Sequence, residues 1–215
     1  MVGLSPHSNG RSSKELNIMW NERYTEAGFA YGTEPNDFLF ENFNKLKRGK
    51  VLCLGEGEGR NAVFLASKGF DVTAVDLSEV GLEKTLGLAE QNKVTVKTFC
   101  ADLSDFRIDE NYWESIVSIW VHLESVVCRV VHQKVFSGLK TGGTFLLEAY
   151  TPQQLEFGTG GGKQVDKMVS LNSLQEELKG LDFEIGREII REIHEGKYHN
   201  GQSAVVQVLA RKYNV

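Results

Sequence analysis

The sequence predicts an α/β fold: a mostly parallel sheet with helices on both faces and an antiparallel hairpin at the C-terminal end. From Lys50 onward, short apolar segments alternate with segments of helical spacing. The apolar segments are apolar throughout, which is typical of parallel strands buried on both faces. A turn with glycines at Gly55, Gly57 and Gly59 follows the first strand. Together these three observations indicate a sheet with a ligand-binding turn at one edge.

The elements follow one another in a regular order. Strands are predicted over residues 51–54, 72–75, 94–99, 115–121 and 144–149, with helices over 61–67, 80–91 and 130–139. Two further strands, 183–194 and 203–211, lie on either side of "EGKYHNGQS", with Asn200-Gly201 predicted as the turn. A short turn joins antiparallel neighbours, so one C-terminal strand is expected to run antiparallel.

The N-terminal end differs from the rest of the chain. Residues 1–13 are rich in Ser, Asn and Gly and are predicted to be a mobile tail. From Lys14, polar and apolar positions recur at helical spacing through Trp20 and Tyr24. The chain contains no repeat of solenoid length and no long linker, so residues 14–215 are predicted to form a single domain.

Composition excludes several classes of function. The 215 residues are 41% hydrophobic and 25% charged, as in an ordinary globular protein with one core. The net charge of -5 comes without a block of like charges, which argues against a nucleic-acid partner. No apolar stretch approaches the roughly 20 residues of a membrane span, and the first residues do not resemble a signal peptide. We therefore expect no membrane association and a cytoplasmic location.

The three cysteines indicate structural roles. Cys53, Cys100 and Cys128 lie in or beside apolar runs, without a CxxC pair and without a His and Cys cluster at metal-ligand spacing. We interpret them as free core residues in a reducing compartment and expect no bound metal.

The glycine turn carries the main functional signal. Its spacing is GxGxG, and Arg60 stands where the dinucleotide motif GxGxxG has its third glycine, so the dehydrogenase pattern is not met. Glu56 and Glu58 would repel a pyrophosphate. A ligand that carries positive charge suits this loop better.

Two acidic residues follow the next strands. Asp76 ends the second strand, at the position where an acid accepts hydrogen bonds from ribose hydroxyls. Asp102 lies just past the third strand, where a carboxylate can accept from an exocyclic amine such as that of adenine. Both could instead be helix caps or turn residues. The glycine turn together with Asp76 favours a nucleoside-bearing cofactor.

The sequence resembles a known enzyme family at these positions. "VLCLGEGEGRNA", Asp76 and "CADLSDF" resemble the first three motifs of class I S-adenosylmethionine-dependent methyltransferases, and "LKTGGTFLLEAY" resembles a later strand that usually reads LKPGG. "WNERYTEAGFAYGTEPNDFL" and "LLEAYTPQQLEFGTGGG" resemble the tellurite-resistance branch, so the resemblance covers nearly all of the chain from Trp20. It implies a Rossmann-like seven-stranded sheet whose last strand is antiparallel. It also implies S-adenosyl-L-methionine as cofactor and methyl transfer to a small-molecule acceptor, with thiol, selenium and tellurium species among the candidates.

The resemblance also implies a set of cofactor contacts and one departure from the family. Cys53 stands where most class I enzymes have an acid, and Glu56 is a candidate to supply the missing charge. This departure leaves a non-catalytic S-adenosylmethionine-binding module as an alternative, and a nicotinamide-dependent oxidoreductase is a weaker one. The predicted cofactor-binding residues are Tyr24, Tyr31, Gly55, Glu56, Gly57, Gly59, Arg60, Asn61, Asp76, Leu77, Ala101, Asp102, Leu103 and Ser118.

Methyl transfer depends mainly on holding donor and acceptor about 3 Å apart. A soft, anionic acceptor needs no general base, whereas an alcohol or a carbon acid needs one. His122 after the fourth strand and Tyr150 after the fifth are the candidate catalytic residues, with a structural role as the alternative for each. The other histidines considered, His132, His194 and His199, are expected at the surface away from the site.

Two segments are candidate covers of the site. The first combines aromatic faces, which attract a sulfonium, with Arg23, which can bind a carboxylate; its aromatic residues are Trp20, Tyr24 and Tyr31. Packing of Trp20 on the sheet is the alternative. The second, residues 157–165, is glycine-rich and is predicted to be a mobile lid. It does not match a P-loop, so ATP or GTP hydrolysis is disfavoured.

Overall fold

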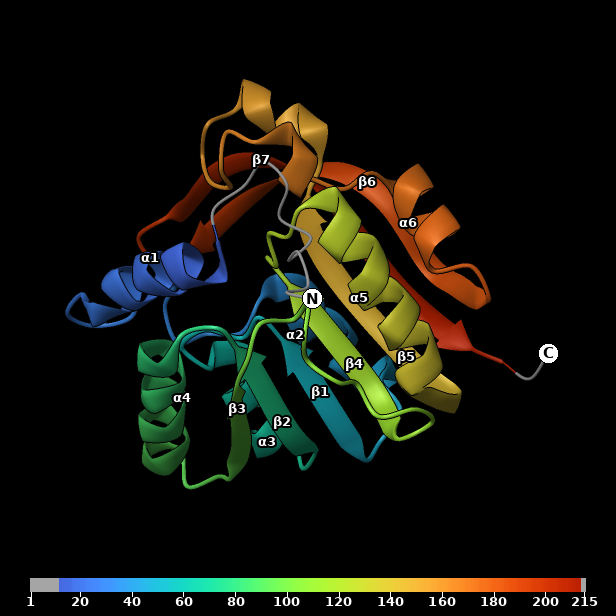
Figure 1. The fold of residues 1–215 in the computed structure, drawn as a ribbon, viewed down its shortest axis with the longest axis horizontal. Helices are drawn as coiled ribbons and strands as arrows, with labels where there is room; N and C mark the ends of the chain where they lie inside the picture. The colour runs from blue at the N-terminus through green and yellow to red at the C-terminus, as the bar shows by residue number, and fades with distance from the viewer. Residues whose placement is uncertain (1–11, 214–215) are drawn as a thin grey trace, which may run out of the picture.

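The computed structural model describes residues 12–213, which form a seven-stranded sheet with helices on both faces (Figure 1). The strand order is β3-β2-β1-β4-β5-β7-β6. Strands β1 to β5 pair in parallel, and β7 runs antiparallel to both β5 and β6, as predicted. The strands are β1 (Lys50–Leu54), β2 (Asp71–Asp76), β3 (Val96–Cys100), β4 (Trp113–Ile119), β5 (Leu139–Tyr150), β6 (Leu181–Glu195) and β7 (His199–Lys212).

The helices cover the sheet in two layers. They are α1 (Ser13–Thr25), α2 (Asp37–Asn42), α3 (Arg60–Ser67), α4 (Glu79–Gln91), α5 (Ser125–Gly138) and α6 (Leu171–Glu177), with 3-10 turns η1 (Phe43–Lys45), η2 (Pro152–Glu156) and η3 (Val165–Lys167). Side chains alternate along β1: Val51 and Cys53 pack into the core on the α3 and α4 side, and Leu52 and Leu54 into the core on the α5 and α6 side. This alternation explains why β1 is apolar at every position.

The first described helix begins with a cap. Ser12 and Glu15 form a capping box, in which each side chain accepts the backbone N–H of the other residue. The predicted mobile tail, residues 1–13, falls largely outside the described residues. Within residues 12–213, no helix combines the length and the apolar character that crossing a bilayer requires.

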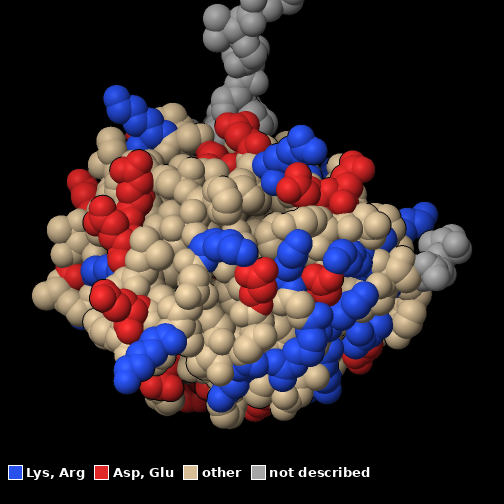
Figure 2. Space-filling model, turned by 90° about the horizontal axis from the view of Figure 1, so that it is seen from below, with Lys and Arg blue, Asp and Glu red and all other residues tan. Residues whose placement is uncertain are grey.

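The carboxyl ends of the parallel strands meet at the edge of the sheet that faces α1 (Figure 1). The connection from β3 to β4, residues 101–112, is made of turns and irregular backbone instead of a helix. Asp102 shapes its start, because its carboxylate accepts the N–H of Ser104 at 2.9 Å. The opposite side of the molecule carries the amino ends of the strands, and there Lys and Arg gather in a band (Figure 2).

The predicted boundaries differ most from the structure in three places. The hairpin turn comprises residues 196–198 and not Asn200-Gly201, since Glu195 pairs with His199 in the ladder. Contacts with the N-terminal segment favour this turn: Lys197 donates its N–H to the carbonyl of Ala30 at 2.8 Å. Helix α5 begins earlier than residue 130, and β5 begins at Leu139 instead of residue 144.

Candidate functional site

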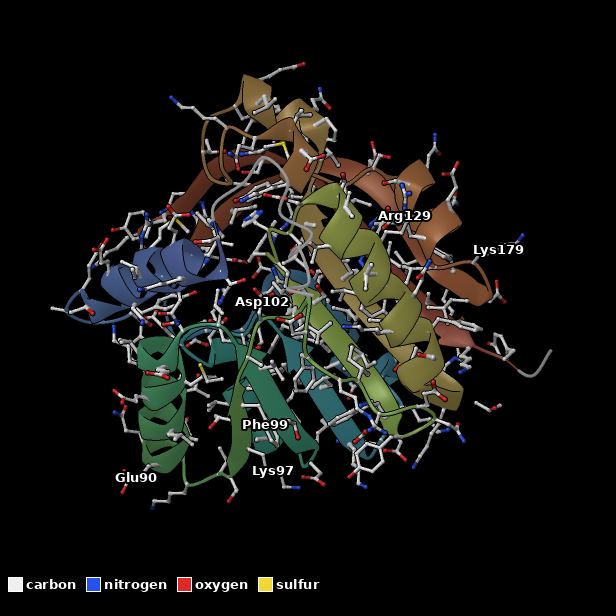
Figure 3. The ribbon with its side chains drawn as sticks, viewed as in Figure 1. Glu90, Lys97, Phe99, Asp102, Arg129 and Lys179 are labelled. Carbon is white, nitrogen blue, oxygen red and sulfur yellow. The ribbon has the colours of Figure 1, made fainter. Side chains whose placement is uncertain are left out.

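Three adjoining cavities lie at the carboxyl ends of the parallel strands. Cavity A is bounded by the ends of β2 and β3, where Asp76, Leu77 and Asp102 line it, and by Trp20 of α1. Figure 3 shows Asp102 just beyond β3, at the edge of the sheet that faces α1. Two acids from neighbouring strands therefore face one cavity, as their positions in the sequence predict.

Asp76 holds the glycine loop in place. One carboxylate oxygen accepts the N–H of Gly57 and the other accepts the N–H of Ser78, each at 2.8 Å. Gly59 takes a φ of +91° immediately before α3, a conformation that favours glycine. Burial raises the pKa of Asp76 to about 6, despite the three backbone hydrogen bonds that favour its charged form.

The two glutamates of the loop are already bound to the protein. Glu56 accepts the N–H groups of Asn61 and Ala62 at 3.0 and 2.7 Å, so it caps α3. Its burial raises its pKa to about 7. Glu58 accepts from Lys84 Nζ at 2.8 Å and from the N–H of Ala30 at 2.7 Å. Neither carboxylate is a free repulsive charge.

Cavity B lies over the glycine loop, and one of its lining residues, Arg60, belongs to a buried ion pair. Its lining also includes Asn61, Tyr24 and Tyr31. Arg60 Nη2 donates to Glu195 Oε2 at 2.5 Å, and both side chains are less than a tenth exposed.

Trp120 Nε1 donates to the same oxygen of Glu195 at 2.6 Å, and Asn36 donates to the other oxygen at 2.9 Å. Burial alone would raise the pKa of Glu195, but its interactions with His199, Arg60 and Trp120 hold that pKa well below its usual range. Arg60 is therefore fixed by an ionised partner beneath cavity B.

Cavity C is an open basin beside the other two. It is lined by residues 158–163 of the glycine-rich segment, by Arg23 of α1 and by the hairpin turn around Lys197. Trp20 and His122 line all three cavities, so these two side chains mark the place where the cavities meet.

His122 follows β4, as predicted, and lies at this junction. Its ring is parallel to the ring of Tyr150, with centroids 5.8 Å apart. Burial, with smaller contributions from His199 and Lys167, lowers the pKa of His122 to about 4. The imidazole is therefore neutral at pH 7 and is a weak base.

Tyr150 ends β5 and is 1% exposed. Its ring stacks on Trp120 at a centroid distance of 4.5 Å, and it lines none of the three cavities. Gly160 and Gly161 cover it, since a Cβ at Gly160 would lie 2.3 Å from the Tyr150 hydroxyl. That hydroxyl has no hydrogen-bond partner among the described residues. Burial raises the pKa of Tyr150 above its ordinary value.

The structure brings together most, but not all, of the predicted cofactor residues. Those that line cavity A are Tyr24, Gly55, Asp76, Leu77, Ala101, Asp102 and Leu103. Those that line cavity B are Tyr24, Tyr31, Gly55, Glu56, Arg60 and Asn61. Gly57, Gly59 and Ser118 line none of the three cavities; the first two shape the loop, and Ser118 is buried in β4.

Sequence reasoning missed two residues of the site and misplaced two histidines. His199 was predicted at the surface, but it is 5% exposed and lines cavities B and C. The misplaced hairpin turn explains this error, because His199 begins β7. His132 is likewise buried, whereas the side chain of His194 is 75% exposed, as predicted. No motif or spacing in the sequence pointed to Trp120 or Glu195. In the structure Trp120 has a φ of +56°, which is uncommon outside glycine.

The structure brings together one group of Cys, His and Glu side chains that the sequence analysis did not predict. Cys128 and His132 are four residues apart on α5, and with Glu177 of α6 they offer ligand atoms within 4.8 Å of one another. His132 Nδ1 and Glu177 share a hydrogen bond of 2.6 Å, and this pair joins α5 to α6. Glu177 is distant in the sequence, so spacing alone did not reveal the group.

A family comparison identifies the chain. The model of the family described as tellurite resistance protein TehB matches residues 22–150, more than half of the 215 residues. The chain belongs to the TehB family. The matched region contains the glycine loop, Asp76, Asp102 and both candidate catalytic residues, so it covers most of the lining of cavities A and B.

Individual relatives agree with this assignment. The chain is 29% identical over 135 residues to "Uncharacterized methyltransferase YbaJ" of Bacillus subtilis, covering 57% of this chain and 52% of that protein. It is 36% identical over 74 residues to "Probable S-adenosyl-L-methionine-dependent methyltransferase TehB" of Haemophilus influenzae, covering 34% of this chain and 26% of that protein. The matches thus span about half or less of these relatives.

The fold also agrees with the assignment to the TehB family. The crystal structure of TehB from Haemophilus influenzae superposes with a TM-score of 0.68 at 21% identity, over 91% of this chain and 66% of that chain. The predicted Rossmann-like sheet is therefore confirmed as the fold of this family.

Proposed function

We propose that this protein is an S-adenosylmethionine-dependent methyltransferase that acts on a small-molecule acceptor. The observation that carries the proposal is the placement of Asp76, which accepts a hydrogen bond from the glycine loop and lines a cavity that shares lining residues with the one over that loop. The names of the relatives from Bacillus subtilis and Haemophilus influenzae support the same activity.

The residues of cavities A and B fit S-adenosylmethionine. We assign Asp76 to the ribose hydroxyls and Asp102 to the adenine amine, with Leu103 against the adenine ring. We also assign Leu77 and Ala101, which line the same cavity, to contacts with the nucleoside.

In cavity B, Arg60 suits the carboxylate of the methionine part, and Tyr24 and Tyr31 present aromatic faces toward a cation. The backbone of Gly55 and the side chains of Glu56 and Asn61 complete this part of the site. Three of the predicted residues would affect cofactor binding only indirectly, through the loop and strand to which they belong: Gly57, Gly59 and Ser118.

The cofactor supplies a methyl group on a positively charged sulfur when it is bound. The chain's own contribution is position: Trp20 and His122 form the junction through which an acceptor in cavity C meets a ligand in cavities A and B. His122 is a weak base, since its pKa is about 4, and Tyr150 is covered by glycines. We infer that His122 orients the acceptor, that Tyr150 supports the wall, and that the acceptor arrives already nucleophilic.

Cavity C distinguishes this proposal from a non-catalytic binding module. A module that only binds S-adenosylmethionine has no need of a second basin that opens at the junction.

Residues 14–215 are proposed to act as one domain, because all seven strands share one sheet and α1 packs on α4. The free cysteines fit a reducing compartment such as the cytoplasm.

Calorimetry with four ligands tests the proposal. We expect S-adenosylmethionine and S-adenosylhomocysteine to bind the purified chain, and NADH and ATP not to bind. Asp76→Ala should abolish binding of the first two, whereas the exposed Asp71→Ala should leave it unchanged. Binding of NADH alone, or of none of the four, would refute the assignment.

A further inference from the structure

Cavity C has an unusual charge pattern. Three cations line it, Arg23, Lys163 and Lys197, and no Asp or Glu is among its lining residues. The whole chain has a net charge of -5, whereas the Lys and Arg side chains of this basin are all positive and no Asp or Glu opposes them in the lining. The lining of cavity C favours an anion.

The cations differ in how strongly they are held. Arg23 lies over the ring of Tyr198, with Cζ 3.7 Å from the ring centroid. Lys197 Nζ lies 3.4 Å from Glu26, a carboxylate outside the lining that also accepts from the Tyr198 hydroxyl. Lys163 forms no hydrogen bond or ion pair within residues 12–213. Two of these cations are therefore fixed beside the basin, and the third is unpaired.

The rim that carries Lys163 is built into the fold. Thr159 Oγ1 donates to the carbonyl of Gln202 at 2.6 Å, and the carbonyl of Thr159 accepts the N–H of Asn200 at 3.2 Å. Gly160 and Gly161 lie directly on Tyr150, where a Cβ would not fit. The glycine-rich segment, predicted as a mobile lid, is thus fastened to β7 and holds Lys163 at the edge of the basin.

The basin also leads to the reaction centre. Trp20 and His122 line cavity C as well as the two cavities assigned to the cofactor, and His199 and Tyr31 line both cavity B and cavity C. An acceptor in cavity C therefore has its inner end at this aromatic junction and its outer end among the cations.

We propose that cavity C is the acceptor site and that it selects small acceptors carrying a negative charge, held by Lys163, Lys197 and Arg23. This inference rests on the proposed methyl transfer and adds the charge class of the acceptor. Exposed cations contribute modestly one by one, but three around one ligand with no opposing carboxylate in the lining add up.

Three thiols that share the stem HS–CH2–CH2 test the charge selection: 3-mercaptopropionate, 2-mercaptoethanol and cysteamine. Their binding to the protein saturated with S-adenosylhomocysteine is measured by ligand-observed NMR. We expect the anionic thiol to bind about tenfold more tightly than the neutral one, and the cationic thiol more weakly than either. Raising the salt to about 0.5 M should reduce the difference, because the charges are exposed.

Variants separate the site from general charge effects. The double variant Lys163→Ala and Lys197→Ala should lose about tenfold in affinity for 3-mercaptopropionate and none for 2-mercaptoethanol. Lys179→Ala is the matched control, because Lys179 is exposed beyond α6, far from α1 (Figure 3). Equal binding of the three thiols, or equal losses in the double variant and the control, would overturn the inference. Failure of S-adenosylhomocysteine to bind would instead refute the proposed function.

Discussion

Asp76 combines a structural task with a proposed binding task in one carboxylate. Its oxygens hold Gly57 and Ser78, and the same side chain lines cavity A. Burial disfavours the charged form, which is why its pKa lies near 6 and not near 4. A ligand that donates hydroxyl hydrogen bonds stabilises the charged form, so ligand binding and ionisation of Asp76 are coupled.

This coupling predicts the pH dependence of cofactor binding. Below pH 6 the free protein holds a proton on Asp76 that the bound state releases, so affinity for S-adenosylhomocysteine should rise as the pH increases from about 5 to 7. Asp76→Asn should remove this rise and lower affinity at pH 7 by about 10- to 100-fold, as for loss of hydrogen bonds to a charged group. Calorimetry over this pH range provides the measurement. If the rise persists in Asp76→Asn and disappears in Glu56→Gln, the titrating group is Glu56, whose pKa is about 7.

Tyr150 allows a second test at the residue scale. Its buried hydroxyl forms no hydrogen bond within residues 12–213, so Tyr150→Phe should leave the free energy of unfolding unchanged or raise it by about 1 kcal/mol. Affinity for S-adenosylhomocysteine should not change. Urea denaturation gives the first quantity, with the more exposed Tyr112→Phe as the control. A loss of stability above about 1 kcal/mol would mean that the hydroxyl is bonded in solution.

The glycine loop and α3 form the element on which the site depends. Gly59 ends the loop at a positive φ, and a Cβ there would lie 2.7 Å from two side-chain atoms of Thr85 and 2.8 Å from its Cα. Because one of these atoms belongs to the backbone of α4, the clash cannot be relieved by a side-chain rotation alone. The close packing of α3 on α4 therefore requires glycine at this position.

A comparison of two glycines isolates this packing effect. Gly69 has a similar φ of +84°, but nothing lies within 4 Å of its Cβ position. We expect Gly69→Ala to cost about 1 kcal/mol from backbone strain alone, and Gly59→Ala to cost about 3 kcal/mol because overpacking adds to the strain. Chemical denaturation of both variants measures the difference. Equal losses would show that backbone strain explains the whole effect.

Buried charges join distant parts of the whole molecule. Glu195, at the end of β6, binds Arg60 at the start of α3, Trp120 after β4 and Asn36 before α2. Arg191 of β6 adds a bond of 2.9 Å to the fully buried Glu148 of β5. The C-terminal hairpin and the N-terminal segment are thereby held around the glycine loop.

Breaking this network should destabilise the entire fold. Glu195→Gln leaves Arg60 buried without its counter-charge, and we expect a loss of about 3 kcal/mol in the free energy of unfolding. The matched control is Asp71→Asn, which breaks an exposed pair with Lys97 and should cost less than about 1 kcal/mol. Thermal and urea unfolding measure both. Similar small losses in the two variants would show that the buried network contributes little.

The sequence by itself determined the parallel sheet, the glycine loop and the acids that follow it, because these depend on local periodicity and on residues close together in the chain. Asp76 and Asp102 were predictable, since the carboxyl ends of parallel strands meet at one edge. Only the tertiary structure decided the surroundings of cavities B and C. Glu195 and His199 reach the site from the last hairpin, more than 130 residues after the loop, and their register depends on contacts such as that of Lys197 with Ala30. Such long-range packing leaves no periodic trace in the chain, so it can be seen only once the chain is folded.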